Sequence, residues 1–322
     1  MYSNITFKGV IAISDQLHLN LDAVIKASTQ SVTSRILNEN ARKRILSFIR
    51  HKEHYFFGQL AYVHGILFAG EDNRNAALIQ DLHKLAAAVE LYARSFDIFD
   101  DLEDQDNLEE PWMQIPHPEA LNLATLMYTV SMQLFTEMDR SGLLVPMVHD
   151  YSIRAMQGQH EDLTGSAQTE EACLEMMKLK SGSLIAMASM AGVLYSTHTF
   201  LTPVEEYSIH FGIAAQIDND FRDLFHSHKS DLVTKKNTLA KLYIGRKFNS
   251  QSEDLLGFFE SGLSYSEMYG SVDSYKSMLL KAGVIPYLNV MKQISIQKAI
   301  LSLNKLSLTT DQIEIIKSHL IK

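Results

Sequence analysis

Four aspartates near residue 100 have spacings that could bind a divalent cation. Asp97, Asp100, Asp101 and Asp104 end an otherwise apolar run, and at about 100° per residue they fall within roughly a third of a helix circumference. We call the last three the first acidic motif. Like charges at this spacing repel one another, and acidic residues normally favour the opposite, N-terminal end of a helix. The arrangement therefore favours a hard-cation site over a solvated helix end.

A second oxygen-rich segment lies far downstream. It contains Asn219, Asp220 and Asp223, preceded by Gln216, and we call the first three the second acidic motif. Asn219 and Asp223 are four residues apart and share one helix face. Mg²⁺ takes few carboxylates and keeps waters or substrate phosphates as its other ligands, so two such faces that converge predict a diphosphate site. The expected metal ligands are Asp100, Asp104, Asn219, Asp220 and Asp223.

Several lysines near these segments could bind the negative charge of a diphosphate. Lys180 starts a Lys-Ser-Gly-Ser segment, and Lys229, Lys235 and Lys236 follow the second acidic motif. A lysine by itself is typical of a solvated surface. Their positions beside the acidic segments favour substrate binding, to which they would contribute preorganised positive charge.

Helices are the elements expected to position these side chains. From about residue 34 onward, apolar residues recur at spacings of three and four, which predicts α-helix almost throughout. The predicted helices lie near 36–50, 54–70, 77–104, 119–140, 146–163, 170–196, 203–225 and 235–245, with more to follow. Ser264-x-x-Glu267 and Thr309-x-x-Gln312 match the capping box that starts a helix. Since we find no linker or repeat, we predict one all-α domain over 1–322, with 1–33 as an N-terminal extension.

The composition fits a globular protein and excludes several other classes. Of the 322 residues, 46% are hydrophobic and 21% charged, which is typical of a protein with a sizeable core. A net charge of −9 argues against a nucleic-acid partner, which requires a basic surface. The single cysteine, Cys173, excludes an internal disulfide and a thiolate metal cluster. Without a recognisable signal peptide or an apolar run of about 18 residues, a cytoplasmic location is expected.

Five segments in order give the chain a resemblance to the trans-isoprenyl diphosphate synthase family. They are Asp100-Asp101-x-x-Asp104, Gly158-Gln159-x-x-Asp162-Leu, Lys180-Ser-Gly-x-Leu184, Asn219-Asp220-x-x-Asp223 preceded by Gln216, and Asp231-Leu-x-x-x-Lys236-x-Thr238-Leu239. One such motif is a weak signal, whereas five in the order of the family are specific. The resemblance runs from roughly residue 40 to residue 245.

This resemblance implies an isoprenoid-synthase-like helical bundle around a deep apolar cavity, with two acidic helix faces at its mouth. The implied reaction is departure of diphosphate from an allylic prenyl diphosphate, with two or three Mg²⁺ ions neutralising the leaving group. An electron-rich acceptor must then capture the carbocation. The implied catalytic residues are Asp100, Asp101, Asp104 and Lys180, and the implied substrate-binding residues include Gln159, Gln216, Lys229 and Lys236. Because family members are commonly dimers, a homodimer is expected.

The chain departs from the family where a second diphosphate, isopentenyl diphosphate, would bind. The family's Gly-Lys-Arg-x-x-Arg-Pro segment is absent from the corresponding stretch at 51–58, and a histidine common before the first acidic motif is Ala93 here. An Arg-Arg-Gly segment after that motif is Glu109-Glu110-Pro111. Two anions in place of two cations would cost several kcal/mol beside a charged substrate at an effective dielectric of about 20. Isopentenyl diphosphate is therefore a poor candidate for the acceptor.

A synthase fold that keeps the donor site and loses this acceptor site resembles the ComQ-type prenyltransferases. These modify a tryptophan of a small precursor peptide that becomes a quorum-sensing pheromone. The segment from Asp97 to Asn107 looks like that group, with the extra Asp97 as part of the substrate site. The implied step is attack of the indole ring on the prenyl cation. Asn219 is a weaker Mg²⁺ ligand than a carboxylate and resembles class I terpene synthases, but the rest of their second motif fails to match at Asp223 and Ser227.

Three aromatic residues near the first acidic motif have different expected roles. Phe96 and Tyr92 lie one and two turns before Asp100, where aromatic side chains limit chain length in the family. A plain core role is the alternative for both. If their side chains form the bottom of the cavity, the donor carries a geranyl or farnesyl group. Trp112, in a proline-containing loop, is expected to pack on the surface.

Two other functions remain open from the sequence. The first is an ordinary short-chain polyprenyl diphosphate synthase or a class I terpene synthase, which would need no peptide. The second is a catalytically silent partner subunit that kept the fold, although a scaffold has no need for three clustered carboxylates.

Overall fold

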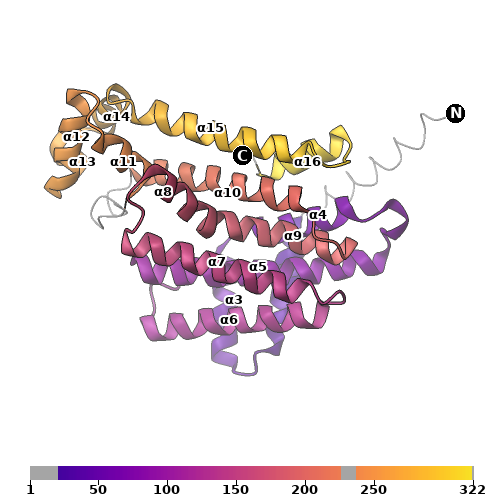
Figure 1. Ribbon diagram of the computed structural model, residues 1–322. Helices are drawn as coiled ribbons and strands as arrows, with labels where there is room; N and C mark the ends of the chain where they lie inside the picture. The colour runs from indigo at the N-terminus through magenta and orange to yellow at the C-terminus, as the bar shows by residue number, and fades with distance from the viewer. Residues whose placement is uncertain (1–20, 226–236, 321–322) are drawn as a thin grey trace. The chain divides into compact units, whose positions relative to one another are not determined.

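The computed structural model describes residues 21–225 and 237–320, which form helices joined by loops, without a strand. The expectation of an all-α protein is therefore confirmed for this part of the chain (Figure 1). The internal contacts divide the chain into two compact units. Unit 1 contains the described residues of 1–151, 185–205 and 303–322, and unit 2 those of 152–184 and 206–302. The predicted single domain over 1–322 stays a prediction.

The helix α5 is central to unit 1, because it packs against α2, α4 and α6. In Figure 1, α5 and α6 lie side by side. The elements of unit 1 are α2 (Leu21–Val32), η1 (Thr33–Arg35), α3 (Glu39–His51), α4 (Phe56–Phe68), η2 (Glu71–Asn73), α5 (Ala76–Asp104), α6 (His117–Met138), the first part of α7 (Leu144–Thr164), most of α9 (Ser183–Thr197), the start of α10 (Thr202–Asp223) and α16 (Thr310–Leu320).

Local sequence accounts for the length and the position of α5. The Asn75 side chain accepts a hydrogen bond from the Leu78 backbone N–H at 3.0 Å and so caps the first turn. Small side chains let α4 approach closely: a Cβ added at Gly58 would lie 2.8 Å from the carbonyl oxygen of Ala86. The helix ends at Gln105, which has a left-handed φ of 55°. This helix thus carries the first acidic motif at its C-terminal end.

Part of the predicted N-terminal extension is a packed element of unit 1. Within the described residues, α2 buries Leu21, Ile25 and Thr29 and packs against α5, α3 and α4. The Asp22 side chain accepts a hydrogen bond from the Tyr55 backbone N–H at 2.8 Å and another from Gln59 Nε2 at 2.7 Å. Residues 21–32 therefore help to hold α4 against α5.

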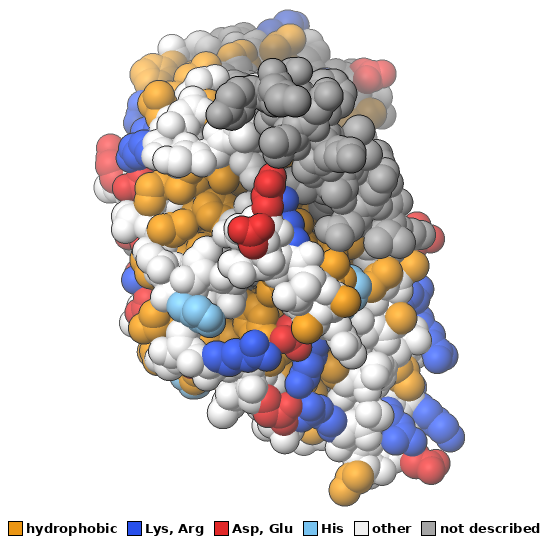
Figure 2. Space-filling model, turned by 90° about the vertical axis from the view of Figure 1, so that its right-hand side faces the viewer, with side chains coloured by type: hydrophobic (Ala, Val, Ile, Leu, Met, Phe, Trp, Pro, Cys, Tyr) orange, Lys and Arg blue, Asp and Glu red, His pale blue; other side chains and the backbone are white. Residues whose placement is uncertain are grey.

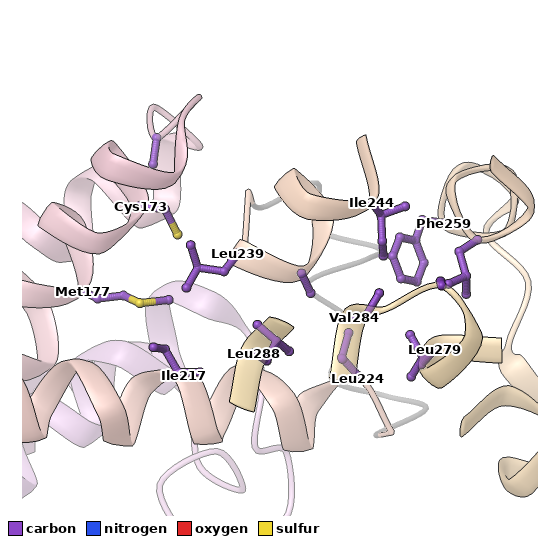
Figure 3. Close-up of a cluster of buried hydrophobic side chains, with 14 of the residues drawn as sticks. Cys173, Met177, Ile217, Leu224, Leu239, Ile244, Phe259, Leu279, Val284 and Leu288 are labelled. Atoms are coloured by element: carbon purple, nitrogen blue, oxygen red, sulfur yellow. The ribbon is translucent and has the colours of Figure 1, made fainter. Parts of the chain in front are cut away.

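Unit 2 has its own hydrophobic core, shown in Figure 3. Side chains from α8, α10, α11, α12, α14 and α15 meet there, including Met177, Ile217, Leu239, Phe259 and Leu288. Its elements are the end of α7, α8 (Glu170–Met177), η3 (Lys178–Gly182), most of α10, α11 (Leu239–Gly245), α12 (Ser250–Ser261), α13 (Tyr265–Tyr269), α14 (Val272–Lys281) and α15 (Val284–Leu303). Ile213, Ile217 and Leu224 of α10 belong to this core, which therefore supports the helix that carries the second acidic motif.

The predicted helices agree with the observed ones to within a few residues, except that the helix expected near 235–245 begins at Leu239, with 235–236 outside the described residues. A further local difference lies within one helix. The expected helix over 170–196 runs through α8, a single π-helical turn at η3, and α9. Such turns often occur at functional sites. Both predicted capping boxes form, since Ser264 and Glu267 exchange hydrogen bonds, as do Thr309 and Gln312. No helix in the described part of the chain is both long and apolar enough to span a membrane.

Candidate active site

The four aspartates at the acidic end of α5 differ in how deeply they are buried. The Asp97 side chain is 42% exposed, and Asp100 and Asp104 are half-buried. Asp101, in contrast, is buried, with 5% of its surface exposed. All four aspartates lie on α5 as predicted, and Asp101 is the one whose side chain is buried in the protein.

Two neutral donors hold the buried carboxylate of Asp101. Trp112 Nε1 donates to Asp101 Oδ2 at 2.7 Å, and the Asn107 amide donates to Asp101 Oδ1. Burial raises the pKa of Asp101 to about 7, although both hydrogen bonds oppose this effect by stabilising the carboxylate. A carboxylate with two donors keeps further acceptor capacity, so a catalytic role for Asp101 stays a prediction.

The expectation of a surface role for Trp112 is wrong. The residue is 1% exposed, its ring packs edge-on against Phe48 at a centroid distance of 5.7 Å, and Lys52 Nζ lies 5.5 Å from the ring centroid. A buried indole needs a partner for its N–H, and Asp101 supplies it. The loop after the first acidic motif is thereby anchored to the motif itself.

A buried arginine, Arg94, lies near the first acidic motif and was not among the residues predicted for the site. Arg94 is 7% exposed and donates to Glu90 at 2.8 Å and to Asp97 at 2.8 Å. Burial raises the pKa of Glu90, against the effects of Arg94 and of the Gly58 N–H, which donates to Glu90 at 3.0 Å. The spacings of three and four residues were the available signal for this pairing. Asp97, predicted to bind substrate, is thus an ion-pair partner of Arg94.

The two segments that depart most from the family lie next to each other in unit 1. Lys52 Nζ lies 2.9 Å from Glu110 Oε1, and His51 Nε2 lies 3.4 Å from Glu110 Oε2. The segments 51–58 and 109–111, which both differ from the family pattern, are far apart in the sequence. In the structure, Lys52 of the first segment forms an ion pair with Glu110 of the second.

The aromatic residues before Asp100 form a cluster between α5 and α6. Tyr92 is fully buried and Phe96 is 9% exposed. Their ring centroids are 4.7 Å apart, and Tyr92 also lies 5.8 Å from Tyr128 and 6.1 Å from Phe135 of α6. The cluster lies one to two turns before the acidic end of α5. Both the core role and the chain-length role remain compatible with this packing.

Close backbone contacts bring three predicted motifs together in unit 2. A Cβ added at Gly158 of α7 would clash with the backbone nitrogen of Lys180 in η3. A Cβ added at Gly212 of α10 would lie 2.5 Å from the Cα of Gly182. Lys180 Nζ lies 2.9 Å from Asp162 Oδ2. The glycines therefore set the separation of the helices, and η3 lies between α7 and α10.

The second acidic motif is supported by this arrangement. Gln216 Nε2 donates to Asp220 Oδ1 at 2.8 Å, and the Ser181 hydroxyl donates to Gln216 Oε1. Asp220 is 8% exposed, whereas Asn219 is exposed and Asp223 is half-buried. Gln216, predicted to bind substrate, thus contacts Asp220, and Gln159 lies half-buried on α7. Lys229 and Lys236 lie outside the described residues.

The oxygen donors of both motifs suit Mg²⁺, which prefers carboxylate and carbonyl ligands. Among the residues that the structure describes, no three His, Cys, Asp or Glu side chains form a group that could hold a metal ion. A dedicated protein cage is not required, since Mg²⁺ is usually bound through one or two carboxylates together with substrate phosphates. The donor set therefore fits ions that arrive with a diphosphate.

Charged side chains of both signs are mixed on the face drawn in Figure 2, where lysine and arginine lie among aspartate and glutamate. A nucleic-acid site needs a continuous basic surface. The exclusion of nucleic acid as a partner, which was based on the net charge of −9, stays a prediction.

Comparisons with known proteins agree with this geometry. A model of the polyprenyl synthetase family matches residues 62–261. The tryptophan prenyltransferase ComQ of Bacillus subtilis subsp. natto is 37% identical over 301 residues, which cover 94% of this chain and 92% of that protein. The tryptophan prenyltransferase ComQ of Bacillus subtilis strain 168 is 38% identical over 290 residues, which cover 90% of this chain and 95% of that protein.

A solved structure confirms the fold. A geranylgeranyl pyrophosphate synthase superposes with a TM-score of 0.80 at 16% identity, covering 93% of this chain and 97% of that chain. The isoprenoid-synthase fold expected from the sequence is therefore confirmed, as is the expectation of a prenyltransferase. The chain belongs to the polyprenyl synthetase family.

Proposed function

We propose that this protein transfers a geranyl or farnesyl group from its diphosphate to a tryptophan of a small precursor peptide, in the maturation of a quorum-sensing pheromone. The observation that carries the proposal is the 37% identity to a tryptophan prenyltransferase over 94% of the chain. A cytoplasmic location and a homodimer are parts of the same proposal.

The residues of α5 and α10 would handle the diphosphate of the donor. Asp100 and Asp104 in unit 1, and Asn219, Asp220 and Asp223 in unit 2, are the proposed Mg²⁺ ligands. When bound, Mg²⁺ would neutralise the charge that develops on the departing diphosphate. Asp101 orients the end of α5 through its hydrogen bonds to the following loop.

Lys180 would contribute fixed positive charge to the same step. Its ammonium group is held by Asp162 at 2.9 Å, and the side chains of the two residues are only 13% and 14% exposed. A charge held in place before the reaction stabilises developing negative charge without the cost of reorganisation. Asp162 offsets part of this charge, so Lys180 is proposed to assist Mg²⁺, which would neutralise most of the charge on the leaving diphosphate.

The prenyl chain would lie against the aromatic cluster of α5 and α6. Phe96 and Tyr92 occupy the positions one and two turns from the acidic end, and large rings there limit the length of the chain that fits. This supports a geranyl or farnesyl donor over a longer one. The acceptor is an indole, whose electron-rich ring carbon would capture the carbocation, and the released diphosphate would accept the indole proton.

The test is a donor-and-acceptor assay. The full-length protein is incubated with geranyl or farnesyl diphosphate, Mg²⁺ and a tryptophan-containing precursor peptide, with isopentenyl diphosphate as a competing acceptor. The expected result is a mass gain of one prenyl unit on the peptide, and a peptide with Trp→Phe should gain none. The proposal fails if neither donor modifies the peptide.

A short-chain polyprenyl diphosphate synthase is the second candidate. The match to the polyprenyl synthetase family over residues 62–261 favours it. The same assay distinguishes the two, because elongation with isopentenyl diphosphate in place of peptide modification would support the synthase. A volatile hydrocarbon formed without peptide would indicate a class I terpene synthase. Biological activity that survives Asp100→Asn would indicate a silent partner subunit.

A further inference from the structure

The cations beside the acidic end of α5 are each paired with a carboxylate. Lys52, directly after α3, contacts Glu110 at 2.9 Å, and the imidazole of His51 lies 3.4 Å from the same carboxylate. Arg94 is held between Glu90 and Asp97 at 2.8 Å from each. A diphosphate binds where positive charge is available to it. In this part of unit 1, that charge is already neutralised within the protein.

The Glu110 side chain is held in this position by the loop around it. The Glu110 backbone N–H donates to the Asn107 carbonyl at 2.8 Å, and the Asn107 amide donates to Asp101. Two residues further on, Trp112 donates to Asp101 at 2.7 Å and packs beneath Lys52. Two anchors to one carboxylate thus flank Glu110 and fix the contact with Lys52.

We propose that Glu110 is a specificity-determining residue, which keeps a second diphosphate from binding by occupying Lys52. This inference rests on the proposed function, in which the acceptor is a peptide. Glu110 would act in two ways, since it neutralises Lys52 and its own charge repels an anionic acceptor. An uncharged indole on a peptide meets neither obstacle.

The neighbouring Glu109 provides a matched control. It carries the same charge one residue earlier, but it is exposed, whereas the Glu110 side chain is 21% exposed and contacts Lys52. A general effect of removing one negative charge would appear in both Glu→Gln variants. An effect of releasing Lys52 would appear only in Glu110→Gln, which keeps the size and polarity of the side chain.

The experiment measures binding of isopentenyl diphosphate by calorimetry. Titrations use the full-length protein without divalent ions, so that the acidic motifs do not bind the probe through a metal. Glu110→Gln should bind about two- to fivefold more tightly than the parent, since a partly exposed ion pair is worth about 0.5–1 kcal/mol. Glu109→Gln should bind like the parent. Adding Lys52→Ala to Glu110→Gln should abolish the gain.

Several results would overturn the inference. These are no tighter binding in Glu110→Gln, equal tightening in Glu109→Gln, or a gain that survives Lys52→Ala. Melting temperatures within a few degrees of the parent establish that each variant is folded. Because binding is measured without peptide or donor, this result is independent of the peptide-modification assay. The proposal of a tryptophan acceptor and the proposal that Glu110 excludes a second diphosphate can therefore be refuted independently of each other.

Discussion

Each acidic motif contains one buried carboxylate, but the two are held in different ways. Asp101 is 5% exposed and accepts from Trp112 and Asn107, which belong to the loop after α5. Asp220 is 8% exposed and accepts from Gln216, one turn earlier on its own helix. The position of Asp101 thus depends on the fold of a loop, whereas the position of Asp220 is largely set by α10.

The surroundings of Asp101 and Asp220 therefore have different proposed roles. The loop that anchors Asp101 also carries Glu110, so the first acidic motif and the residue proposed to select the acceptor are linked through one loop of unit 1. Around Asp220, the Ser181 and Gln216 contacts are neutral and arise within the motifs implied for the donor. Changes in acceptor preference should therefore disturb the first region more than the second.

The largest effect is expected from Asp100→Asn. Loss of a proposed Mg²⁺ ligand should lower kcat by about a thousandfold, the scale of removing a group that stabilises developing charge. Initial rates of peptide prenylation at saturating donor measure this. Glu103→Gln, an exposed residue of the same helix, is the control and should retain most of the rate. Equal losses in both variants would contradict a specific role for Asp100.

The buried Asp101 predicts a pH dependence of stability. Its pKa is raised from 3.8 in the unfolded chain to about 7 in the folded protein. Between these values the folded protein keeps a proton that the unfolded chain has released, so the free energy of unfolding should fall as the pH rises from about 4 to about 7. The total change should be of the order of a few kcal/mol, and it should level off above about pH 7.

Thermal unfolding as a function of pH, in the presence of EDTA, tests this dependence. The variant Asp101→Asn cannot titrate, so its melting temperature should fall less over the same window. An unchanged slope in Asp101→Asn would assign the dependence to other groups.

Removing one donor should show how much Asp101 depends on the loop. Trp112→Phe keeps an aromatic ring but leaves the Asp101 carboxylate without its indole partner, which should lower the free energy of unfolding by about 1–3 kcal/mol. Chemical denaturation measures this. Trp112→Phe should also make the loop after α5 easier to cleave by protease. Unchanged protease sensitivity would argue against Trp112 as the anchor of the loop.

The corresponding change in α10 should have the smallest effect. Gln216→Met removes the donor to Asp220 at similar volume and should cost about 1 kcal/mol. Protease sensitivity of the loop after α5 should stay the same, since the anchors of that loop to Asp101 lie within unit 1 and Gln216 belongs to unit 2. A loss larger than that of Trp112→Phe, measured by the same denaturation, would reverse the contrast between the two motifs.

The helices and the motifs could be predicted from the sequence because both depend on short, regular spacings. Periodic apolar residues predicted α5 to within one residue of its observed start and at its observed end. The segments at 158 and 180, which the sequence assigned to one family pattern, lie together in space, although the pattern itself did not predict their contact. Burial along a single helix face was not predictable. Asp101 and Asp104 share that face, and their different burial depends on how the loop after α5 folds back.

Contacts between distant segments could not be predicted in the same way. The proline-rich neighbours of Trp112 indicate a loop and hence a surface position, but the Asp101 carboxylate that accepts its N–H lies 11 residues earlier. The Lys52–Glu110 pair spans 58 residues. A single sequence carries no signal for such pairs. The ion pairs of Arg94 are different, because its spacings of four residues from Glu90 and three from Asp97 on one helix can be read from the sequence.

The close contacts at Gly158, Gly182 and Gly212 also bear on how such an enzyme can evolve. They position η3, and with it Lys180, through backbone contacts that do not depend on the side chains proposed to select the acceptor. Side chains that select the acceptor can then be exchanged one at a time without displacing the group proposed to attract the leaving diphosphate. A chain with this architecture can acquire a new acceptor while the chemistry of its donor is inherited unchanged.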